Sequence, residues 1–418
     1  MNEARASDAS GLQSPMNGPL HSDDEVTRVL HGLPVDFVPV AVSYEGLGPL
    51  QYLRTERHWQ LWRRRLDGRK TDMLPVSYEM YVAHRLEIET EILSEIYLRP
   101  AWTHVPHCQT AQDIAGCAVV RQGEDLFWVQ PDGQASWIAP TLQGEEARIG
   151  SRWSDLWDRG ETEEVVGEAA AEFDHLLQPV PEPTPEQVEA VAGSQAWDLA
   201  KALAERFKDE LPQYVVGISP YNRLPYRLGF QALMYAMTEM PEKLHQILQG
   251  GMPQPSARLA AARSLGISLM FVEECMASAD IISPKMYQEF AYEYDRPALQ
   301  FYEDMGFRTA LYFSGNLMPL LRHLKELPFT ALFCEEDRKN YGIDLGEVRR
   351  AVGPDKVLFG NLDALFVQNA SDEDLLSEVK RQINVGGPRN FILSLGSPMT
   401  PGTTLERVRL VTESTRRI

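Results

Sequence analysis

Acidic residues close two short apolar runs in the second half of the chain. Glu273 and Glu274 end the first run, and Glu335 and Glu336 end the second. Apolar runs of this length that stop in polar residues are typical of buried strands in α/β proteins. One further strand candidate lies between the two runs, so we expect both acidic pairs at the same edge of a parallel sheet, roughly 10 Å apart.

Carboxylates at that edge can bind a cationic group, hold a metal ion, or act as acid and base with separated pKa values. Acids that cap a helix or lie in solvent are the alternative. Because successive side chains of a strand point to opposite faces, one glutamate of each pair must face away from the site. The sequence does not decide which one, so Glu273, Glu274, Glu335 and Glu336 are all catalytic candidates.

Small polar residues follow three other apolar runs. Ser314 and Asn316 come after the run 309–313, Asn361 and Asp363 come after 356–359, and Ser397 comes after 390–395. Hydroxyl and amide groups in these places can bind a substrate through hydrogen bonds. The same residue types also cap helices, and a helical segment follows each of the three runs.

Two further groups of residues give weaker signals. Tyr221 and Arg223 follow the run 213–219, and an arginine there suits a substrate that carries a carboxylate. His104, His107 and Cys108 form a compact cluster, but no second pair of ligands accompanies them, so an ordinary polar loop is the preferred interpretation. No metal ligand is assigned, and a divalent metal is left open as a cofactor.

The candidate residues must be positioned by alternating strands and helices. The apolar runs number eight, and helix-like segments follow the later ones, at 284–305, 317–325, 344–352, 371–385 and 404–415. Alternation of this kind predicts parallel βα units, and eight units predict a (β/α)8 barrel with its site at the carboxyl ends of the strands. An open doubly wound sheet is the alternative, but the segment 43–48 is a poor match to the glycine-rich turn that such a sheet usually carries. The eight strand candidates are 36–43, 96–104, 213–219, 267–272, 309–313, 330–334, 356–359 and 390–395.

The first half of the chain departs from a bare barrel. Residues 1–21 are expected to be a disordered tail, and residues 22–418 are expected to form the barrel, with a helix that starts near Ser22–Glu25. The stretch 117–139 predicts a β-hairpin insertion, with a Pro-Asp-Gly turn between its last two strands. The stretch 151–210 predicts helices that are interrupted by the proline-rich run 179–185, which connects to a helix at 186–210.

Composition limits the partners of this chain. Its 418 residues carry a formal net charge of −20, which disfavours nucleic acid and anionic membrane surfaces. The apolar runs are shorter than a membrane-spanning helix requires, and no export signal is visible after Met1. The four cysteines lack pairing motifs, which favours reduced thiols. We therefore expect a cytoplasmic protein with a small-molecule substrate.

Three stretches of the second half carry a family resemblance: 279–287 (ADIISPKMY), 360–363 (GNLD) and 395–403 (LGSPMTPGT). With them, residues from about 210 to the C-terminus resemble the uroporphyrinogen decarboxylase superfamily, which includes zinc-dependent methyl-transferring proteins that act on corrinoid carriers. The resemblance implies a (β/α)8 barrel with its site at the rim, and often a homodimer.

The chain also departs from the motifs of that superfamily. The Arg-Gln-Ala-Gly-Arg type of loop, which grips substrate carboxylates in uroporphyrinogen decarboxylases, is not found, and Ser397 stands where those enzymes have a histidine. The methyl-transferring relatives bind zinc through a His-x-Cys motif and a later cysteine. Residues 313–315 read Phe-Ser-Gly here, and 396–397 supply no thiolate.

These observations together predict a divergent lyase of the decarboxylase type that acts on a small or aromatic carboxylated substrate. A methyltransferase or demethylase that uses a corrinoid or another carrier is one alternative. A barrel that binds a ligand without catalysis is the other.

Overall fold

The computed structural model of the protein describes residues 24–41, 49–96, 102–141, 162–173, 180–207, 211–337, 340–387, 389–397, 399–400 and 402–416. The predicted tail, 1–21, lies outside these residues.

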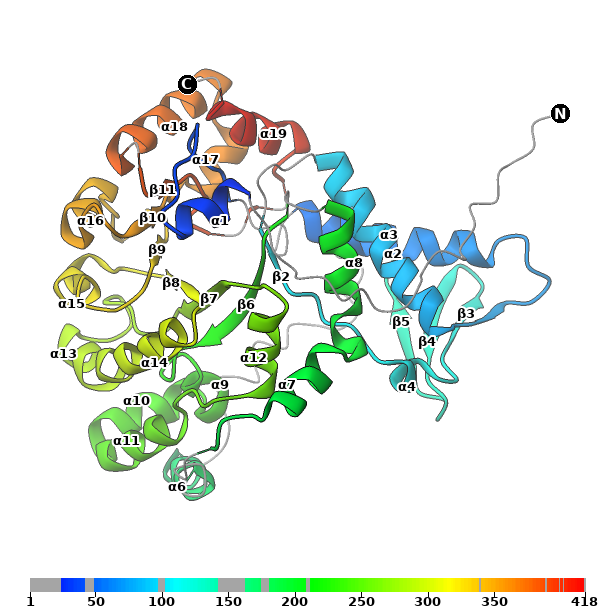
Figure 1. The fold of residues 1–418 in the computed structure, drawn as a ribbon, viewed down its shortest axis with the longest axis horizontal. Helices are drawn as coiled ribbons and strands as arrows, with labels where there is room; N and C mark the ends of the chain where they lie inside the picture. The colour runs from blue at the N-terminus through cyan, green and yellow to red at the C-terminus, as the bar shows by residue number, and fades with distance from the viewer. Residues whose placement is uncertain are drawn as a thin grey trace.

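A curled parallel sheet of seven strands forms the centre of the molecule, with helices around its outer face (Figure 1). Each strand overlaps one of the predicted apolar runs, so the predicted α/β barrel class is confirmed. From one edge to the other the strands are β11 (Phe391–Ile392), β10 (Val357–Phe359), β9 (Ala331–Cys334), β8 (Arg308–Phe313), β7 (Leu269–Glu274), β6 (Gln213–Ile218) and β2 (Thr103–His104).

The remaining predicted strand, 36–43, contributes a single bridge instead of a full strand. Val40 pairs with Leu393 in parallel, next to β11. The Ala41 N–H donates to the Leu393 carbonyl at 2.9 Å, and the Leu393 N–H donates to the Pro39 carbonyl at 2.8 Å. Proline has no N–H to extend this ladder, and residues 42–48 lie outside the described part of the chain.

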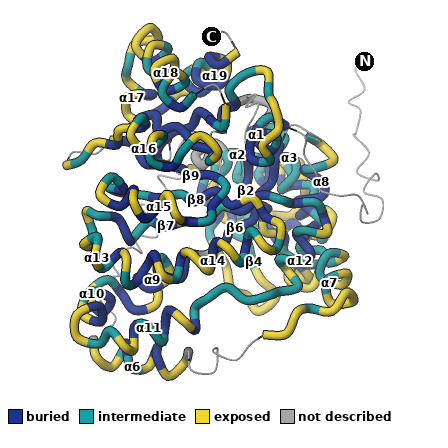
Figure 2. Tube along the Cα trace, turned by 60° about the vertical axis from the view of Figure 1, so that its left-hand side comes forward, coloured by how far each residue is buried: buried dark blue, intermediate teal, exposed yellow. Residues whose placement is uncertain are grey.

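Side-chain alternation divides the sheet into two packed faces. The inner face carries aromatic rings in contact: Phe271 lies 5.7 Å from Tyr312, Tyr312 lies 4.9 Å from Phe333, and Phe333 lies 5.1 Å from Phe359, all between ring centroids. The outer face packs residues such as Met270 against the helices. The strands are therefore buried on both sides, while the helices alternate between buried and exposed residues (Figure 2).

Twelve described helices cover the outer face or the ends of this sheet. They are α1 (Glu25–Leu30), α9 (Leu224–Leu228), α10 (Phe230–Glu239), α11 (Pro241–Gly250), α12 (Ala257–Ser264), α13 (Pro284–Met286), α14 (Glu293–Asp304), α15 (Leu321–Leu324), α16 (Leu345–Val352), α17 (Ala364–Asn369), α18 (Asp372–Gly386) and α19 (Leu405–Ser414). A π-helical turn, η5 (Tyr287–Tyr292), joins α13 to α14, and a 3-10 turn, η6 (Met318–Leu320), precedes α15. The five helical segments predicted after the later strands are confirmed within a few residues.

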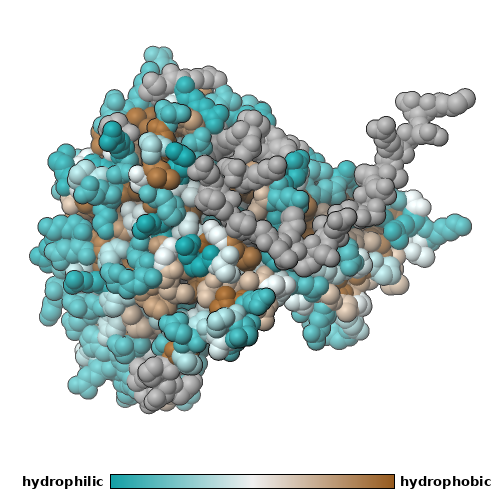
Figure 3. Space-filling model, in the orientation of Figure 1, coloured by the Kyte–Doolittle hydropathy of each residue, from teal (hydrophilic) through white to brown (hydrophobic). Residues whose placement is uncertain are grey.

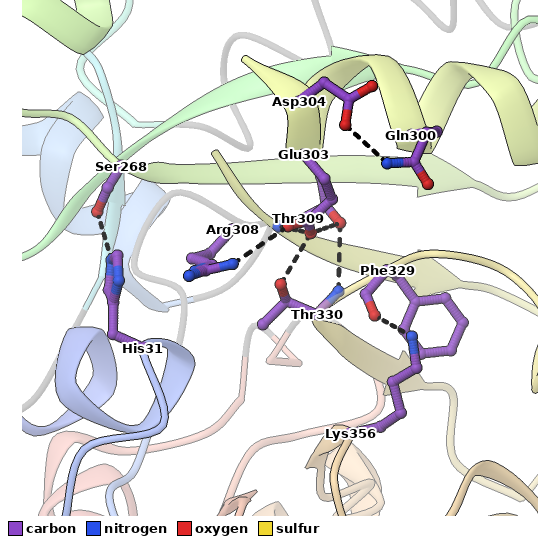
Figure 4. A network of polar contacts seen from close by, with 10 residues as sticks. All are labelled: His31, Ser268, Gln300, Glu303, Asp304, Arg308, Thr309, Phe329, Thr330 and Lys356. Atoms are coloured by element: carbon purple, nitrogen blue, oxygen red, sulfur yellow. Dashed lines mark hydrogen bonds and ion pairs between the residues drawn. The ribbon is translucent and has the colours of Figure 1, made fainter. Parts of the chain in front are cut away.

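The amino ends of the strands form a connected polar layer (Figure 4). Glu303 Oε1 accepts hydrogen bonds from Thr309 N at 2.9 Å, Thr309 Oγ1 at 2.6 Å and Thr330 Oγ1 at 2.8 Å. Arg308 lies 3.6 Å from the other oxygen of Glu303. Lys356 Nζ donates to the Phe329 carbonyl at 2.5 Å. The carboxylate at this end thus has neutral donors and a cation around it.

Helix α1 closes the same end of the sheet. Asp24 caps it by accepting from Val26 N and Thr27 N, in the region where the sequence predicts a helix start. Val26, Val29 and Leu30 join the aromatic inner core, so the amino end of the curled sheet is filled by side chains.

A second unit lies beside the sheet, at the right of Figure 1. It contains α2 (Pro49–Leu66), α3 (Tyr78–Ile96), α4 (Ala111–Ile114) and an antiparallel sheet. The order of that sheet is β1 (Met73–Pro75), β3 (Ala118–Gln122), β4 (Asp125–Val129) and β5 (Ala135–Ile138). The predicted hairpin 117–139 is confirmed, whereas α2, α3 and β1 have no counterpart in the prediction.

The stretch 151–210 is largely helical where it is described, and the described residues 180–184 of the proline-rich run are not helical, as predicted. Its elements are α6 (Thr162–Phe173), α7 (Pro185–Ala192), η3 (Gln195–Trp197) and α8 (Asp198–Phe207). The single helix predicted at 186–210 is wrong, because Gly193 ends α7 and Ser194 begins a 3-10 turn. Residues 151–161 and 174–179 lie outside the described part.

The surface is largely hydrophilic in the view of Figure 3, with scattered apolar residues. Among the described residues, none of the helices is both long and apolar enough to cross a membrane.

Candidate functional site

The register of the sheet decides which glutamate of each pair faces the interior. Phe271 and Phe333 belong to the inner aromatic face, and side chains alternate. Glu273 lies in β7 and Glu335 directly follows β9, each two residues beyond its phenylalanine, so both point to the inner side at the carboxyl end. Glu274 and Glu336 point to the outer side, where they are 0% and 2% exposed.

Glu335 is held by donors from two neighbouring segments. Its Oε2 accepts from Ser314 Oγ at 2.9 Å, from Gly315 N at 2.5 Å and from Tyr341 OH at 3.2 Å. Gly315 has a φ of 88°, and a Cβ there would overlap Ser278. Glycine is therefore required for the backbone N–H to reach the carboxylate, and Ser314 is a direct partner of a predicted catalytic residue.

Asn361 and Ser397 both converge on the dipeptide Glu335–Glu336. Asn361 Nδ2 donates to the Glu335 carbonyl at 3.2 Å, and Ser397 Oγ donates to Glu336 Oε1 at 2.6 Å. Gly396 lies so close that a Cβ would overlap the backbone nitrogen of Glu336. The ends of β9, β10 and β11 thus meet at one place.

Tyrosine and cysteine side chains lie beside the two inward glutamates. Tyr312 OH donates to the Gly396 carbonyl at 3.2 Å, which links the end of β8 to the segment after β11. Burial, and then the nearby Glu273, Glu274 and Glu335, raises the pKa of the Cys275 thiol. Burial also raises the pKa of Tyr226, with smaller contributions from Cys275 and Glu273.

Glu273 differs from Glu335 in its surroundings. Glu273 is an exposed residue, and the partial burial of its carboxyl raises the pKa of this group above the ordinary value. Among the described residues it accepts no hydrogen bond, whereas Glu335 Oε2 accepts three. Two carboxyls of one rim therefore experience unlike environments, which is the usual arrangement of an acid and a charged partner.

Four predicted binding residues lie apart from these contacts. Asn316 Oδ1 accepts from Met318 N at 3.2 Å, and Asp363 caps α17 by accepting from Phe366 N at 2.6 Å. Tyr221 is fully buried with its hydroxyl on Met237 Sδ at 3.5 Å. Arg223 is exposed just after β6.

The side chains of the predicted histidine–cysteine cluster, His104 and Cys108, contact other residues of the fold. The His104 ring lies 5.9 Å from Tyr214, and the Cys108 thiol lies 3.7 Å from Tyr78 OH. In the part of the chain that the structure describes, no group of three or more His, Cys, Asp or Glu side chains is arranged to hold a metal ion.

Sequence reasoning missed Ser219, Tyr312, Tyr341, Cys275 and Asp295. Tyr312 alternates with Ala310 on a predicted strand, and Ser219 ends another, so their positions alone marked them as candidates. Asp295 occurs within the apolar stripe of its helix, between Ala291 and Ala298, and an acid in a buried stripe is the signal that was available.

The fold and the rim define an α/β barrel-type protein with a polar site at the carboxyl ends of its strands. Residues 170–418 match the profile of the family described as Uroporphyrinogen decarboxylase (URO-D). This chain belongs to that family.

Similarity to individual members is distant. A uroporphyrinogen decarboxylase from Thermodesulfovibrio yellowstonii is 30% identical over 132 residues, which cover 31% of this chain and 36% of that protein. A uroporphyrinogen decarboxylase from Dechloromonas aromatica is 24% identical over 230 residues, which cover 52% of this chain and 62% of that protein. The matches thus span less than two thirds of either relative.

A solved structure supports the fold over nearly the whole chain. A methyltransferase from Methanosarcina mazei superposes with a TM-score of 0.56, covering 96% of this chain and 99% of that one at 17% sequence identity. Both members of this comparison share the fold.

Proposed function

We propose that the protein is a lyase of the decarboxylase type that acts on a small or aromatic carboxylated substrate at the inner rim of the sheet. The observation that carries the proposal is the unequal surroundings of Glu273 and Glu335. Membership of the URO-D family and the names of its relatives support the reaction class.

Glu273 is the proton donor in this proposal. The raised pKa of its carboxyl favours the protonated form, which a general acid needs. Glu273 protonates the ring carbon that bears the substrate carboxylate, and a ring cation results. The bond to the carboxylate then breaks, its electron pair neutralises the ring, carbon dioxide leaves, and Glu273 regains a proton from water.

Glu335 stabilises the transient cation in the same scheme. Its Oε2 is fixed by Ser314, Gly315 and Tyr341, so it is oriented before the charge develops. Fixed groups stabilise a transition state without reorganising at the moment of reaction. Asn361, bonded to the Glu335 carbonyl, supports this orientation.

Arg223 is the proposed partner of the substrate carboxylate. It is an exposed guanidinium that follows β6, which ends at the same rim as Glu273. A guanidinium pairs with a carboxylate through two parallel hydrogen bonds. Asn316, Asp363 and Tyr221, which already have partners within the fold, play a structural part in this proposal.

The test is release of carbon dioxide by purified protein. The probes are a panel of aryl carboxylic acids in which the carboxylate is bonded directly to the ring, with product identified by mass spectrometry. We expect turnover of at least one probe, loss of about 10²-fold or more in kcat for Glu335→Gln, and a raised KM for Arg223→Met. Glu242→Gln, at an exposed position of α11, is the control and keeps full activity.

Two outcomes would overturn the proposal. Unchanged turnover in Glu335→Gln removes its assigned role. Turnover that appears only with a methylated corrinoid carrier, together with stoichiometric metal in the pure protein, identifies methyl transfer instead.

A further inference from the structure

Two carboxyls meet behind the rim through a single serine. Ser219 Oγ lies 2.5 Å from Glu274 Oε2 and 2.7 Å from Asp295 Oδ1. Ser219 follows β6, Glu274 ends β7, and Asp295 belongs to α14. The three residues are 2%, 0% and 2% exposed, so the contact is closed to solvent.

The hydrogen-bond count at Ser219 requires an additional proton. A serine hydroxyl has one proton and can donate to one carboxyl only. If both carboxyls were ionised, the second contact would join two oxygens with no hydrogen between them. One of the two carboxyls must therefore carry a proton and donate it to Ser219 Oγ.

We propose that Ser219, Glu274 and Asp295 form a proton-holding triad, which retains one carboxylic proton in the folded protein at neutral pH and thereby fixes the ends of β6 and β7 to α14. The three residues are positioning residues for the rim. That these residues influence catalysis by positioning Glu273 rests on the proposed function. That the triad retains a proton is independent of the proposed function.

The surroundings of the triad agree with a retained proton. Its titratable neighbours are Tyr221 after β6, Cys275 after β7 and Tyr287 in η5, and burial raises the pKa of each, so all three stay neutral. No described lysine or arginine forms an ion pair with Glu274 or Asp295. Burial raises the pKa of both carboxyls, and the nearby Asp295 raises that of Glu274 further.

The π-helical turn before α14 explains how Asp295 reaches this place. Tyr287 and Asp295 are separated by about 80° around a regular α-helix. A π turn adds one residue to the helical repeat, which brings the two positions to nearly the same face. The Tyr287 hydroxyl, on a fully buried side chain, has no hydrogen-bond partner among the described residues. Burial, and then the nearby Asp295 and Glu274, raises the pKa of this hydroxyl.

The triad is connected to the rim through the residues that follow Glu274. Glu274 Oε1 accepts from Met276 N at 3.2 Å, and the Glu274 carbonyl accepts from Ser314 N at 3.0 Å. Cys275 N donates to Asn222 Oδ1 at 3.1 Å. A shift of Glu274 would therefore move the segment that carries Glu273.

The retained proton has a defined effect on stability. A carboxyl whose pKa is raised on folding binds more proton in the folded state than in the unfolded state, so stability falls as pH rises from the unfolded value, near 4, towards the raised value. In Glu274→Gln or Asp295→Asn an amide N–H replaces the shared proton, so the contact with Ser219 no longer requires a proton on the remaining carboxyl.

The experiment is urea unfolding of the full chain from pH 5 to pH 9. We expect the wild-type midpoint to fall with rising pH, and the slope to correspond to about one proton more than in Glu274→Gln or Asp295→Asn. Glu293→Gln, an exposed site on α14, is the control and keeps the wild-type slope. Wild-type slopes in both triad variants would overturn the proposal.

A second measurement, on the wild-type protein, tests the triad even if the variants fail to fold. Infrared spectroscopy of the wild-type protein at pH 7 is expected to contain the carbonyl band of a buried protonated carboxyl. Absence of that band contradicts the triad even if no variant folds. Neither measurement needs a substrate, so failure of the triad and failure of the proposed lyase activity can be told apart.

Discussion

The two ends of the central sheet both place carboxylates among hydroxyl groups, but they balance the charge in different ways. At the amino end, Glu303 accepts from Thr309 and Thr330 and has Arg308 nearby (Figure 4). At the carboxyl end, Glu274 and Asp295 share one serine and have no described cation beside them. The carboxylate at the amino end thus has hydroxyl donors and a cation around it, whereas the two carboxyls at the carboxyl end have one shared hydroxyl and no such cation among the described residues.

This difference follows the division of labour in barrel folds, where the amino ends of the strands serve stability and the carboxyl ends carry the site. It predicts that substitutions at the rim reduce activity more than stability. Substitutions at the amino end should do the reverse.

The largest expected effect is on activity, in Glu273→Gln. Removing the proton donor lowers kcat/KM by about 10² to 10⁴-fold. Because Glu273 accepts no hydrogen bond from the described residues, the free energy of unfolding changes by less than about 1 kcal/mol. Steady-state kinetics measures the loss of activity, and urea unfolding measures the change in stability. A large loss of both would contradict the distinction between the two ends of the sheet.

The next effect is on stability, in Glu303→Ala. The substitution leaves the buried donors of Thr309 and Thr330 without their acceptor, which costs about 3 kcal/mol of unfolding free energy. The folded fraction keeps its kcat. Glu242→Ala, on the exposed face of α11, is the control, and an equally small change in both variants would show that the network at the amino end contributes little.

A smaller loss of unfolding free energy is expected in Gly396→Ala. The added Cβ overlaps the backbone nitrogen of Glu336, so the chain must shift, at a cost of about 2 kcal/mol. Gly167→Ala is a matched control, because its Cβ would meet only Lys243 Nζ at 3.7 Å. Thermal unfolding compares the two, and a stable, fully active Gly396→Ala would contradict the close approach of β9 and the segment after β11.

The pH dependence of activity is the next expected effect, a tenfold change in kcat/KM per pH unit. The general acid must be protonated, and burial raises the pKa of Glu273. We therefore expect kcat/KM to be constant on the acid side of that raised pKa and to fall tenfold per unit above it. Activity that rises through the same range would assign Glu273 the part of a base.

The smallest effect is expected in Tyr312→Phe. The ring packing on Phe333 remains, and the hydrogen bond to the Gly396 carbonyl is lost, which costs about 1 kcal/mol. Tyr235→Phe, on the exposed side of α10, serves as control. Urea unfolding should separate the two variants, and identical midpoints would mean that the bond across the rim has no net stabilising effect.

Much of the fold could be predicted from the sequence, because buried parallel strands are short apolar runs with clear ends. The runs 309–313 and 356–359 coincide with β8 and β10 within a residue. The long helices α2 and α3 were missed because α2 is polar overall and the apolar residues of α3 do not gather on one clear stripe. The break at Gly193 was missed because glycine is also tolerated inside helices.

The site could be predicted only in part. The polar residues that follow the apolar runs predict Glu335, Asn361 and Ser397 at one rim. In the structure, Asn361 and Ser397 both contact the dipeptide Glu335–Glu336. Which glutamate faces inward depends on register, which one residue of slip reverses. The position of Asp295 beside Ser219 depends on a π turn that has no sequence signal of its own. The disordered tail, the homodimer and the cytoplasmic location stay predictions.

The account depends most on Glu273 and Glu335 acting together on one substrate. A double-mutant cycle of Glu273→Gln and Glu335→Gln, measured as kcat/KM for carbon dioxide release, tests this directly. We predict that the double variant is no more than about threefold worse than the poorer single variant, because groups that act as a unit lose their effect together. Losses that multiply would contradict the account, since they would mean that the two carboxyls act independently.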